Sequence, residues 1–219
     1  MKEPNRERKA DIKSINAIQL NEEQKEAKRL IIENQIVIIT GRAGCGKSLV
    51  CAQASLDFLK KKQVDCVYNT RAAIEVGRSL GFLPGSVGEK FDPYMEAFIE
   101  NLNKCCSDKK EVDKLIEDDK IKALPVQFIR GKTIDDVLIV EEAQNLTKAE
   151  MLAIITRLGK TGKIIINGDN EQKDIKDEFN GLSYAIELSK KIKEIKWIKL
   201  KVNHRSDLVG KILDYEYGK

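Results

Sequence analysis

The sequence predicts an α/β fold in which helices cover a parallel β-sheet. Residues 36–40, 137–140 and 163–167 contain apolar runs rich in β-branched side chains, which is typical of strands buried on both faces. Segments with apolar residues at helical spacing alternate with these runs, and this alternation indicates parallel strands. At 219 residues the chain can form one domain with a substantial core, and it is too short for two full lobes of this kind.

Residues 41–48 fit the phosphate-binding pattern G-x-x-x-x-G-K-[ST] and lie between the first predicted strand and a predicted helix at residues 49–60. In such a loop the backbone N–H groups surround an anion, and the positive end of the helix dipole points toward it. Lys47 would reach the β- and γ-phosphates, and the Ser48 hydroxyl would bind Mg²⁺. The predicted nucleotide contacts are Gly41, Arg42, Ala43, Gly44, Cys45, Gly46, Lys47, Ser48 and Leu49. The alternative is a tight turn that matches the pattern by chance.

Composition argues against several classes of protein. No apolar run approaches the roughly 20 residues that a membrane helix requires, and the charged N-terminus differs from a signal peptide, so a cytoplasmic protein is expected. The five cysteines show no C-x-x-C spacing and accompany a single histidine, which argues against a zinc site. They are expected to be small buried side chains, and redox sensing by the adjacent Cys105 and Cys106 is the alternative.

Charge is distributed unevenly along the chain. The formal net charge is +4, and residues 189–219 alone carry nine Lys or Arg against four Asp or Glu. A basic C-terminal sector suits a nucleic-acid backbone, and ordinary solubility is the alternative. Residues 1–14 are charged and nearly free of apolar side chains, which predicts a flexible arm before a domain at residues 15–219.

Asn21 is expected to cap a helix at residues 22–33. The segment 20–24 resembles the one that superfamily 1 helicases place just before their phosphate loop, where a glutamine reads the adenine edge. Gln24 is the matching residue, and its amide offers the donor and the acceptor that the N6 and N7 edge of adenine needs. An exposed helical glutamine without this role is the alternative.

The next part of the chain predicts a second strand at residues 64–69, followed by Thr70 and Arg71. The connection at residues 72–94 is rich in glycine, and connections of this length inside a compact domain are usually functional. Within it, the pair Asp92 and Pro93 predicts a helix start, with the aspartate as cap and the proline in the first turn. Residues 104–122 predict a highly charged helical excursion on the surface.

The third predicted strand, at residues 137–142, ends in two carboxylates, Glu141 and Glu142. The carboxyl ends of parallel strands form the ligand-binding edge of such a sheet, so these side chains are expected near the phosphate loop. Glu141 would hold Mg²⁺ through water, although an aspartate is usual at this position, and Glu142 would orient and deprotonate the attacking water. Two strand-end glutamates without a function are the alternative.

Two further strands complete the predicted sheet. After a helix at residues 148–158 capped by Thr147, the strand at 163–167 ends in the pattern G-D-x-x-Q at residues 168–172. Superfamily 1 helicases use this pattern to sense the γ-phosphate, so Gln172 would contact it or the lytic water, and Asp169 would support the loop. A helix at 182–191 precedes the fifth strand at 195–202, and an amphipathic helix is expected at 207–217.

Between that strand and the last helix, residues 203–206 resemble the helicase motif N-Y-R-S, whose arginine touches the γ-phosphate. Arg205 is therefore the candidate for stabilising transition-state charge. His204 is expected to be structural, because no nucleophile pairs with it.

Together these motifs resemble the PhoH family of ATPases, which is common in bacteria and their phages. The residues that carry the resemblance are 41–48, 71–77, 79–85, 89–94, 128–133, 142–145 and 168–169. The resemblance implies a RecA-like P-loop NTPase core with five parallel strands in the order 5-1-4-3-2, flanked by helices, that binds ATP and Mg²⁺. A composition rich in lysine and isoleucine fits a phage-encoded member, which would act in the host cytoplasm.

Helicases close the nucleotide between two lobes, whereas one lobe is expected here. Either Arg205 acts within its own subunit, or a neighbouring subunit supplies an arginine in a ring. The family resemblance favours a ring, with a hexamer expected.

Three functions are compatible with these motifs. The first is an ATP hydrolase that acts on single-stranded RNA or DNA, with Arg71, Arg130 and Lys132 as candidate nucleic-acid contacts beside the C-terminal lysines. The second, a small-molecule kinase, hardly needs paired glutamates together with G-D-x-x-Q. The third is a nucleotide-gated assembly protein with slow or vestigial hydrolysis.

Overall fold

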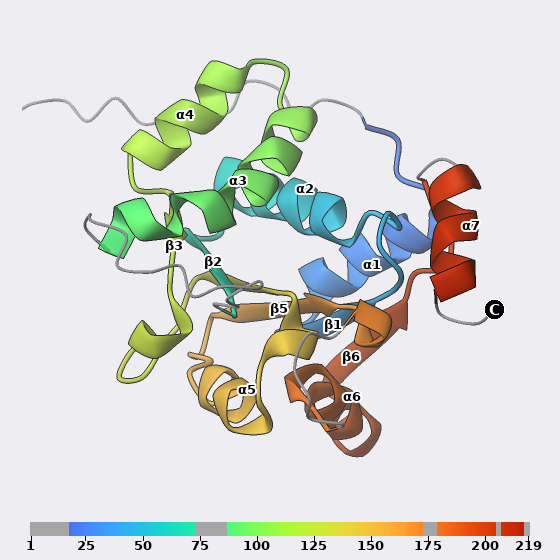
Figure 1. Cartoon of the computed structure of the whole chain (residues 1–219). Coiled ribbons are helices and arrows are strands. Elements are labelled where there is room, and N and C mark those ends of the chain that lie inside the picture. Colours follow the sequence, from blue (N-terminus) through green and yellow to red (C-terminus); the bar gives the residue numbers. More distant parts are fainter. Residues whose placement is uncertain (1–17, 73–86, 173–178, 205–206, 217–219) are drawn as a thin grey trace, which may run out of the picture.

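The computed structural model describes residues 18–72, 87–172, 179–204 and 207–216. Its centre is one six-stranded sheet in which every pairing is parallel, in the order β3-β2-β4-β5-β1-β6. The strands are β1 (Ile36–Thr40), β2 (Val67–Arg71), β3 (Ile121–Ala123), β4 (Val137–Glu141), β5 (Lys163–Gly168) and β6 (Ile195–Lys199). Figure 1 shows the sheet between two layers of helices.

The five predicted strands all form, and their order confirms the predicted 5-1-4-3-2 arrangement. The number of strands was wrong, because β3 adds a sixth strand at the edge next to β2. The strand β3 has only three residues and contains or adjoins lysines. It is too short for an alternation of apolar and polar side chains to reveal it in the sequence. Its formation depends on a neighbour, since Ile121 pairs with Val67 and is buried against the core.

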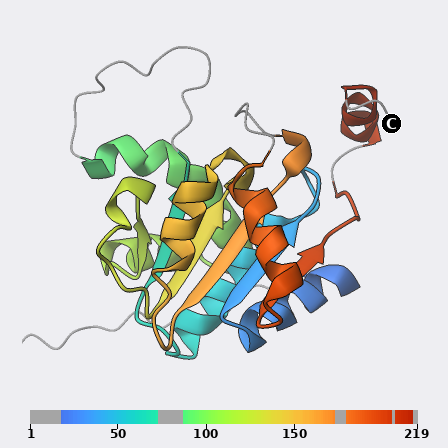
Figure 2. The same cartoon turned by 90° about the horizontal axis from the view of Figure 1, so that it is seen from below.

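Helices cover both faces of the sheet (Figures 1 and 2). On one face lie α1 (Glu22–Glu33), α2 (Lys47–Lys60), α3 (Val87–Cys105) and α4 (Lys109–Glu117), and on the other lie α5 (Lys148–Ile155) and α6 (Gly181–Lys191). The last helix, α7 (Asp207–Glu216), lies on the β6 side of the molecule, apart from α1 (Figures 1 and 2). Short 3-10 turns are η1 (Val126–Phe128), η2 (Ala143–Asn145) and η3 (Asn170–Gln172).

Each strand contributes to two separate cores because side chains alternate between the faces of a sheet. In β4, Val137 and Ile139 pack with the core under α1, α2 and α3, whereas Leu138 and Val140 pack with the core over α5 and α6. By the same alternation Glu141 belongs to the α2 side of the sheet. This orientation directs the carboxylate toward the helix that follows the phosphate loop.

Two helix predictions were wrong. Asp92 and Pro93 lie inside α3, which begins earlier, at Val87. The predicted helical excursion at residues 104–122 is three elements, because α3 ends at Cys105, α4 occupies Lys109–Glu117 and the chain then enters β3. Asp108 separates the two helices, since its side chain accepts the backbone N–H of Lys110 and caps α4.

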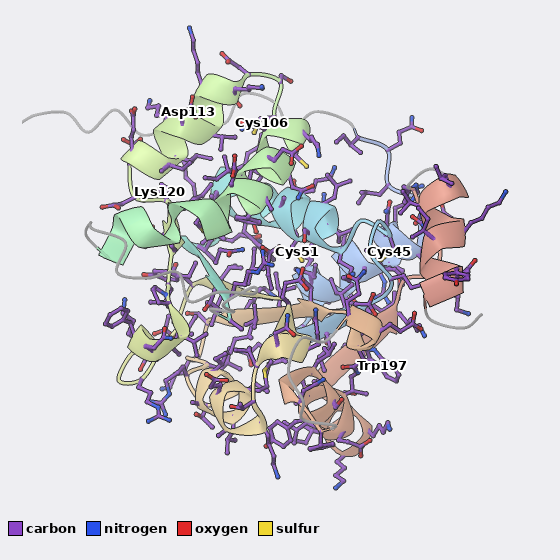
Figure 3. All side chains as sticks on the ribbon, viewed as in Figure 1. Cys45, Cys51, Cys106, Asp113, Lys120 and Trp197 are labelled. Carbon is purple, nitrogen blue, oxygen red and sulfur yellow. The ribbon has the colours of Figure 1, made fainter. Side chains whose placement is uncertain are left out.

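All five cysteines are free and buried, as expected for small core side chains. Burial raises the pKa of the Cys51 thiol to about 12 and the pKa values of the Cys105 and Cys106 thiols to about 11. Figure 3 shows Cys51 on α2 and Cys106 after α3. Thiols with raised pKa values are poor nucleophiles, which argues against redox sensing by the adjacent pair. Among the described helices none combines the length and apolar character needed to span a membrane.

Candidate active site

The phosphate loop connects β1 to α2 and depends on glycine at three positions. Gly41, Gly44 and Gly46 have positive φ angles of 154°, 88° and 84°. A side chain would also collide with neighbours, because a Cβ atom at Gly41 would lie 2.6 Å from the carbonyl oxygen of Leu200 and one at Gly46 would lie 2.5 Å from Gln24 Nε2. The pattern in the sequence therefore reflects both backbone conformation and close packing.

Lys47 is the first residue of α2, and its side chain folds back over the loop. Its ammonium donates to the carbonyl oxygens of Gly41, at 2.6 Å, and Arg42, at 3.3 Å. In the described part of the chain it forms no ion pair with a carboxylate. The ammonium is thus held at the loop by neutral carbonyl groups, and its charge is available to an anion there.

Gln24 braces the loop from α1. Its N–H and side-chain oxygen form a capping box with Asn21, and its Nε2 donates to the carbonyl oxygen of Cys45 at 3.0 Å. Two side-chain amide nitrogens lie close to the Nε2 atom of His204. Gln24 Nε2 is 3.1 Å from it, and Asn21 Nδ2 is 3.0 Å from it. Because the capping box fixes both amide orientations, His204 Nε2 must be an acceptor of both bonds.

These contacts bear on the predicted role of Gln24. Both of its side-chain N–H groups are used within the protein, so contact with an adenine N7 atom would require exchange of one of these bonds. Adenine recognition by Gln24 stays a prediction. The structure adds a second role, since Gln24 links α1, the phosphate loop and the segment after β6.

The segment after β6 returns to the phosphate loop. The backbone N–H of His204 donates to the carbonyl oxygen of Gly44 at 3.0 Å. One carboxylate, that of Glu23, accepts the backbone N–H groups of Lys201 and Val202. The predicted structural role of His204 agrees with these contacts, whereas Arg205 lies outside the described residues and its role stays a prediction.

The acidic part of the site lies at the same edge of the sheet as the loop. Only β5 separates β1 from β4, and neighbouring strands are about 4.8 Å apart, so the ends of β1 and β4 are on the order of 10 Å apart. Glu141 ends β4 and is only 4% exposed. Burial is the main cause of the raised pKa of Cys51, and the charge of Glu141 raises it further while that of Lys47 lowers it. Cys51 therefore lies within electrostatic range of both.

Glu142 follows β4 in a left-handed conformation, with a φ angle of 50°. Such a conformation is uncommon outside glycine and is often found at functional sites. Its carboxylate accepts a hydrogen bond of 2.5 Å from Gln144 Nε2. The turn η2 therefore holds the Glu142 side chain at the sheet edge.

Gln144 is the residue that the predicted site lacked. It is fully buried, and besides Glu142 its Nε2 donates to the carbonyl oxygen of Gln172 at 3.2 Å, while its Oε1 accepts the backbone N–H of Asp169 at 3.0 Å. It thus connects the end of β4 with the end of β5. The sequence did contain an indication of this role. Gln144 lies in the short segment 142–145 between a buried strand and the cap of the next helix, a place where a polar side chain can connect the two strand ends.

Asp169 lies in this bridge, and its carboxylate accepts the backbone N–H of Glu171 at 3.0 Å. Burial raises the pKa of Asp169, and the charges of Glu171 and Glu142 raise it further, against the hydrogen bond and the charge of Lys47. These effects place Asp169 among Lys47, Glu142 and Glu171. The predicted supporting role of Asp169 fits this position. The carbonyl oxygen of Gln172 belongs to the bridge, while the contact of its side chain with the γ-phosphate stays a prediction.

Arg42 ties the loop to two other elements. Its Nε donates to Glu171 in η3 at 3.0 Å, and its Nη1 donates to Asp214 in α7 at 2.6 Å. Hydrogen bonding to Asp214 is the main cause of the raised pKa of Arg42. The guanidinium is therefore neutralised by the protein itself.

The three candidate nucleic-acid contacts do not lie together. Arg71 ends β2 in register with Glu141 of β4, so it belongs to the site edge. Arg130 and Lys132 precede β4, whose first residue lies at the opposite edge of the sheet, and Lys132 Nζ lies 5.6 Å from the centre of the Tyr68 ring. Any nucleic acid that contacts all three must cross a face of the molecule.

Comparison with known proteins identifies the family. A family model described as "PhoH-like protein" matches residues 16–216. The chain belongs to this PhoH-like family. A "PhoH-like protein" of Bacillus subtilis (strain 168) is 37% identical over 195 residues, which are 87% of this chain and 61% of the relative. "Protein PhoH" of Escherichia coli (strain K12) is 36% identical over 170 residues, which are 76% of this chain and 48% of the relative.

The chain therefore spans about half to three fifths of the length of these PhoH-like relatives. Among solved structures, the large terminase of a thermophilic bacteriophage aligns with a TM-score of 0.52 and 9% identity, over 90% of this chain and 50% of the terminase chain. This likeness concerns the fold alone. The resemblance to PhoH proteins and the α/β fold expected from the sequence are both confirmed.

Proposed function

We propose that this PhoH-like chain binds ATP with Mg²⁺ and hydrolyses it. The observation that carries the proposal is the arrangement of the site edge, where the loop that holds Lys47 lies one strand away from the tip that carries Glu141 and Glu142. A phosphate loop opposite paired carboxylates is the arrangement that phosphoryl transfer to water requires.

The residues present fit a nucleotide and its metal ion. Positive-φ glycines leave room for phosphates against the backbone, and Lys47 has no carboxylate partner in the described chain. Mg²⁺ is usually held by one or two side chains together with phosphate oxygens and water, and Ser48 and Glu141 would be those side chains. The ion would supply charge neutralisation at the phosphates.

Each further residue has a proposed task at this edge. Glu142 would accept a proton from the attacking water, and Gln144 would hold that carboxylate in place through its 2.5 Å hydrogen bond. Lys47 would stabilise charge on the transferred phosphate, with Gln172 and Arg205 as the other proposed contacts. Gln24 would contact the adenine edge, and residues 41–49 would surround the phosphates.

We also propose that the chain acts on single-stranded RNA or DNA and works as a ring, with a hexamer expected. The basic C-terminal sector supports a nucleic-acid partner, and Arg71 beside Glu141 offers a cation near the site edge. Size-exclusion chromatography coupled to light scattering tests the ring, and a strictly monomeric protein with a concentration-independent specific rate would exclude it.

The Glu142→Gln variant tests hydrolysis. Removal of the base should lower phosphate release at least about 100-fold while MgATP still binds, because general-base catalysis supplies rate and the loop supplies binding. Glu150→Gln is a control, since that carboxylate caps α5 through Thr147 and has no other hydrogen bond among the described residues. Unchanged turnover in Glu142→Gln would instead favour the second candidate, a nucleotide-gated assembly protein whose slow hydrolysis is incidental.

A further inference from the structure

A cavity of about 390 Å³ lies on the α5 face of the molecule, away from the phosphate loop. Its lining comes from α5, from the residues that follow this helix, and from the turn after η1: Arg130, Ala149, Leu152, Ala153, Thr156 and Arg157. This lining holds two guanidinium groups, one hydroxyl and no carboxylate. Its volume is within the range of small-ligand sites.

Two arginines elsewhere in the described chain are neutralised by carboxylates, whereas the two in this cavity, like Arg71 in β2, are not. Arg29 forms ion pairs with two carboxylates, and Arg42 does the same. Neither Arg130 nor Arg157 has an ion pair in the described part of the chain, and Arg157 Nε is buried there without a hydrogen-bond partner. Two like charges that share a cavity whose lining holds no carboxylate favour an anionic ligand.

The position of Arg157 is fixed by its backbone. Its N–H donates to the carbonyl oxygen of Ile154 at 3.0 Å, and its own carbonyl oxygen accepts the N–H of Ile134 at 2.7 Å. Its Nη2 lies 3.4 Å from the hydroxyl oxygen of Thr156. The backbone of Arg157 is therefore fixed at the cavity, while its guanidinium, with one long hydrogen bond, can turn toward a phosphate without breaking an ion pair.

The residues that α5 itself contributes to the lining are apolar, where a surface helix is normally polar: Ala149, Leu152 and Ala153. Met151 and Ile154 of α5 are completely buried in the core, and on the outward side Leu152 is 44% exposed and Ala149 is exposed as well. A helix that is apolar on both sides is usually covered on both sides. The outward side of α5 therefore offers an apolar surface next to two cations.

We propose that this cavity binds a nucleotide unit of single-stranded nucleic acid. The guanidinium groups of Arg130 and Arg157 hold the backbone phosphate, and a base lies against Leu152 and Ala153. A nucleic-acid strand combines a phosphate anion with an apolar base face, which matches both parts of the lining. This inference rests on the proposed action on nucleic acid and assigns a site to it.

The site is also placed to communicate with the acidic edge. Helix α5 begins at Lys148, directly after the turn that carries Gln144, and its eight residues span about 12 Å. The cavity lies along this one helix. Single-stranded nucleic acid bound in the cavity would contact α5. The N-terminal end of this helix follows the turn that holds Glu142 and Gln144.

The test measures binding of a fluorescein-labelled 12-nucleotide oligouridylate to the full chain by anisotropy at low salt. Arg130→Gln, Arg157→Gln and Leu152→Glu should each weaken binding about 5- to 10-fold, and each arginine variant should reduce the salt slope by about 0.7. Arg157→Lys should keep the salt slope and lose part of the affinity, because lysine lacks the planar fork. Lys109→Gln, which removes an exposed cation from α4, is the matched control and should change affinity less than 2-fold.

The outcomes separate this inference from the proposed function. MgATP binding and basal hydrolysis should be unchanged in all four cavity variants, since none of these residues touches the phosphate loop. If Lys109→Gln and Arg157→Gln weaken oligonucleotide affinity equally, the cavity is not the binding site. That result would leave the proposed function intact. Unchanged oligonucleotide binding together with an altered oligomeric state in Leu152→Glu would also overturn the site, and would assign this face to contact between copies. Specific loss of binding in a protein that does not hydrolyse ATP would support the site and refute the proposed activity.

Discussion

The two halves of the candidate site are built from different kinds of contact. The phosphate-loop half is held by hydrogen bonds of Gln24 and His204, by Lys47, which binds loop carbonyls, and by the two ion pairs of Arg42. The acidic half gathers carboxylates at two strand ends. There Asp169 has a raised pKa, and Glu142 has a left-handed backbone.

This difference suggests how each half responds to substitution. In the loop half the side-chain donors of Gln24 are satisfied within the protein, so their removal should destabilise the fold. In the acidic half, carboxylates are placed close together at a cost in stability, which is common where chemistry requires such an arrangement. Neutralising one of them should therefore stabilise the protein. Gln144 is the exception, because it is the hydrogen-bonded support of the acidic half.

The largest effect is expected for Gln144→Met, which keeps the volume of the side chain and removes its three hydrogen bonds. The free energy of unfolding should fall by about 2–3 kcal/mol, because the Asp169 N–H and the Gln172 carbonyl group lose a buried partner. Phosphate release should fall at least about 10-fold, since Glu142 loses its orienting donor. Urea unfolding and steady-state hydrolysis measure the two effects.

Gln35→Met is the control for this experiment. Gln35 also joins two segments, because its Nε2 donates to the carbonyl oxygen of Lys160 at 2.9 Å, but it is exposed and lies at the opposite edge of the sheet. It should lose less stability than Gln144→Met and keep full activity. Equal activity in both variants would show that Gln144 does not position Glu142.

The contrast between Gln144 and the phosphate loop shows what sequence alone reveals. The loop at residues 41–48 and the carboxylates at the end of β4 are contiguous patterns with local causes, so they were predicted at the right places. The role of Gln144 depends on Asp169 and Gln172, which only the sheet brings to it. The strand β3 was missed for the same reason, since its three residues become a strand by pairing with β2.

In the loop half, Gln24→Ala should lower the free energy of unfolding by about 1–2 kcal/mol. The variant loses the capping box with Asn21 and the bonds to Cys45 and His204. MgATP affinity should fall as well, because the loop loses its brace. Lys25→Gln, on the exposed side of the same helix, is the control. Loss of preference for ATP over GTP with unchanged stability would instead assign Gln24 to base recognition alone.

In the acidic half, Asp169→Asn should raise the free energy of unfolding at neutral pH. The increase should be smaller than the decreases expected for Gln144→Met and Gln24→Ala. The folded-state pKa of Asp169 is raised, so the stability that its protonated form contributes is present below pH 3.8 and is lost as pH rises through the folded-state pKa. Asparagine does not titrate and still accepts the Glu171 N–H. The difference in Tm between variant and parent should be largest near pH 7 and should shrink toward pH 4. A variant that is less stable than the parent at pH 7 would contradict this account of the acidic half.

The smallest effect is expected for Asp214→Asn, which removes one of the two ion pairs between Arg42 and the rest of the protein. The Asp214 side chain is 49% exposed, and Arg42 keeps its pair with Glu171, so the midpoint of global unfolding should hardly change. The pair nevertheless links α7 to the phosphate loop, and backbone amides of α7 should exchange hydrogen faster in the variant while those of α2 should not. Glu26→Gln, which breaks a similar pair within α1, should leave exchange in α7 unchanged. If α7 is equally protected in both variants, the helix is held by contacts other than Arg42, and the two ion pairs of Arg42 serve the loop alone.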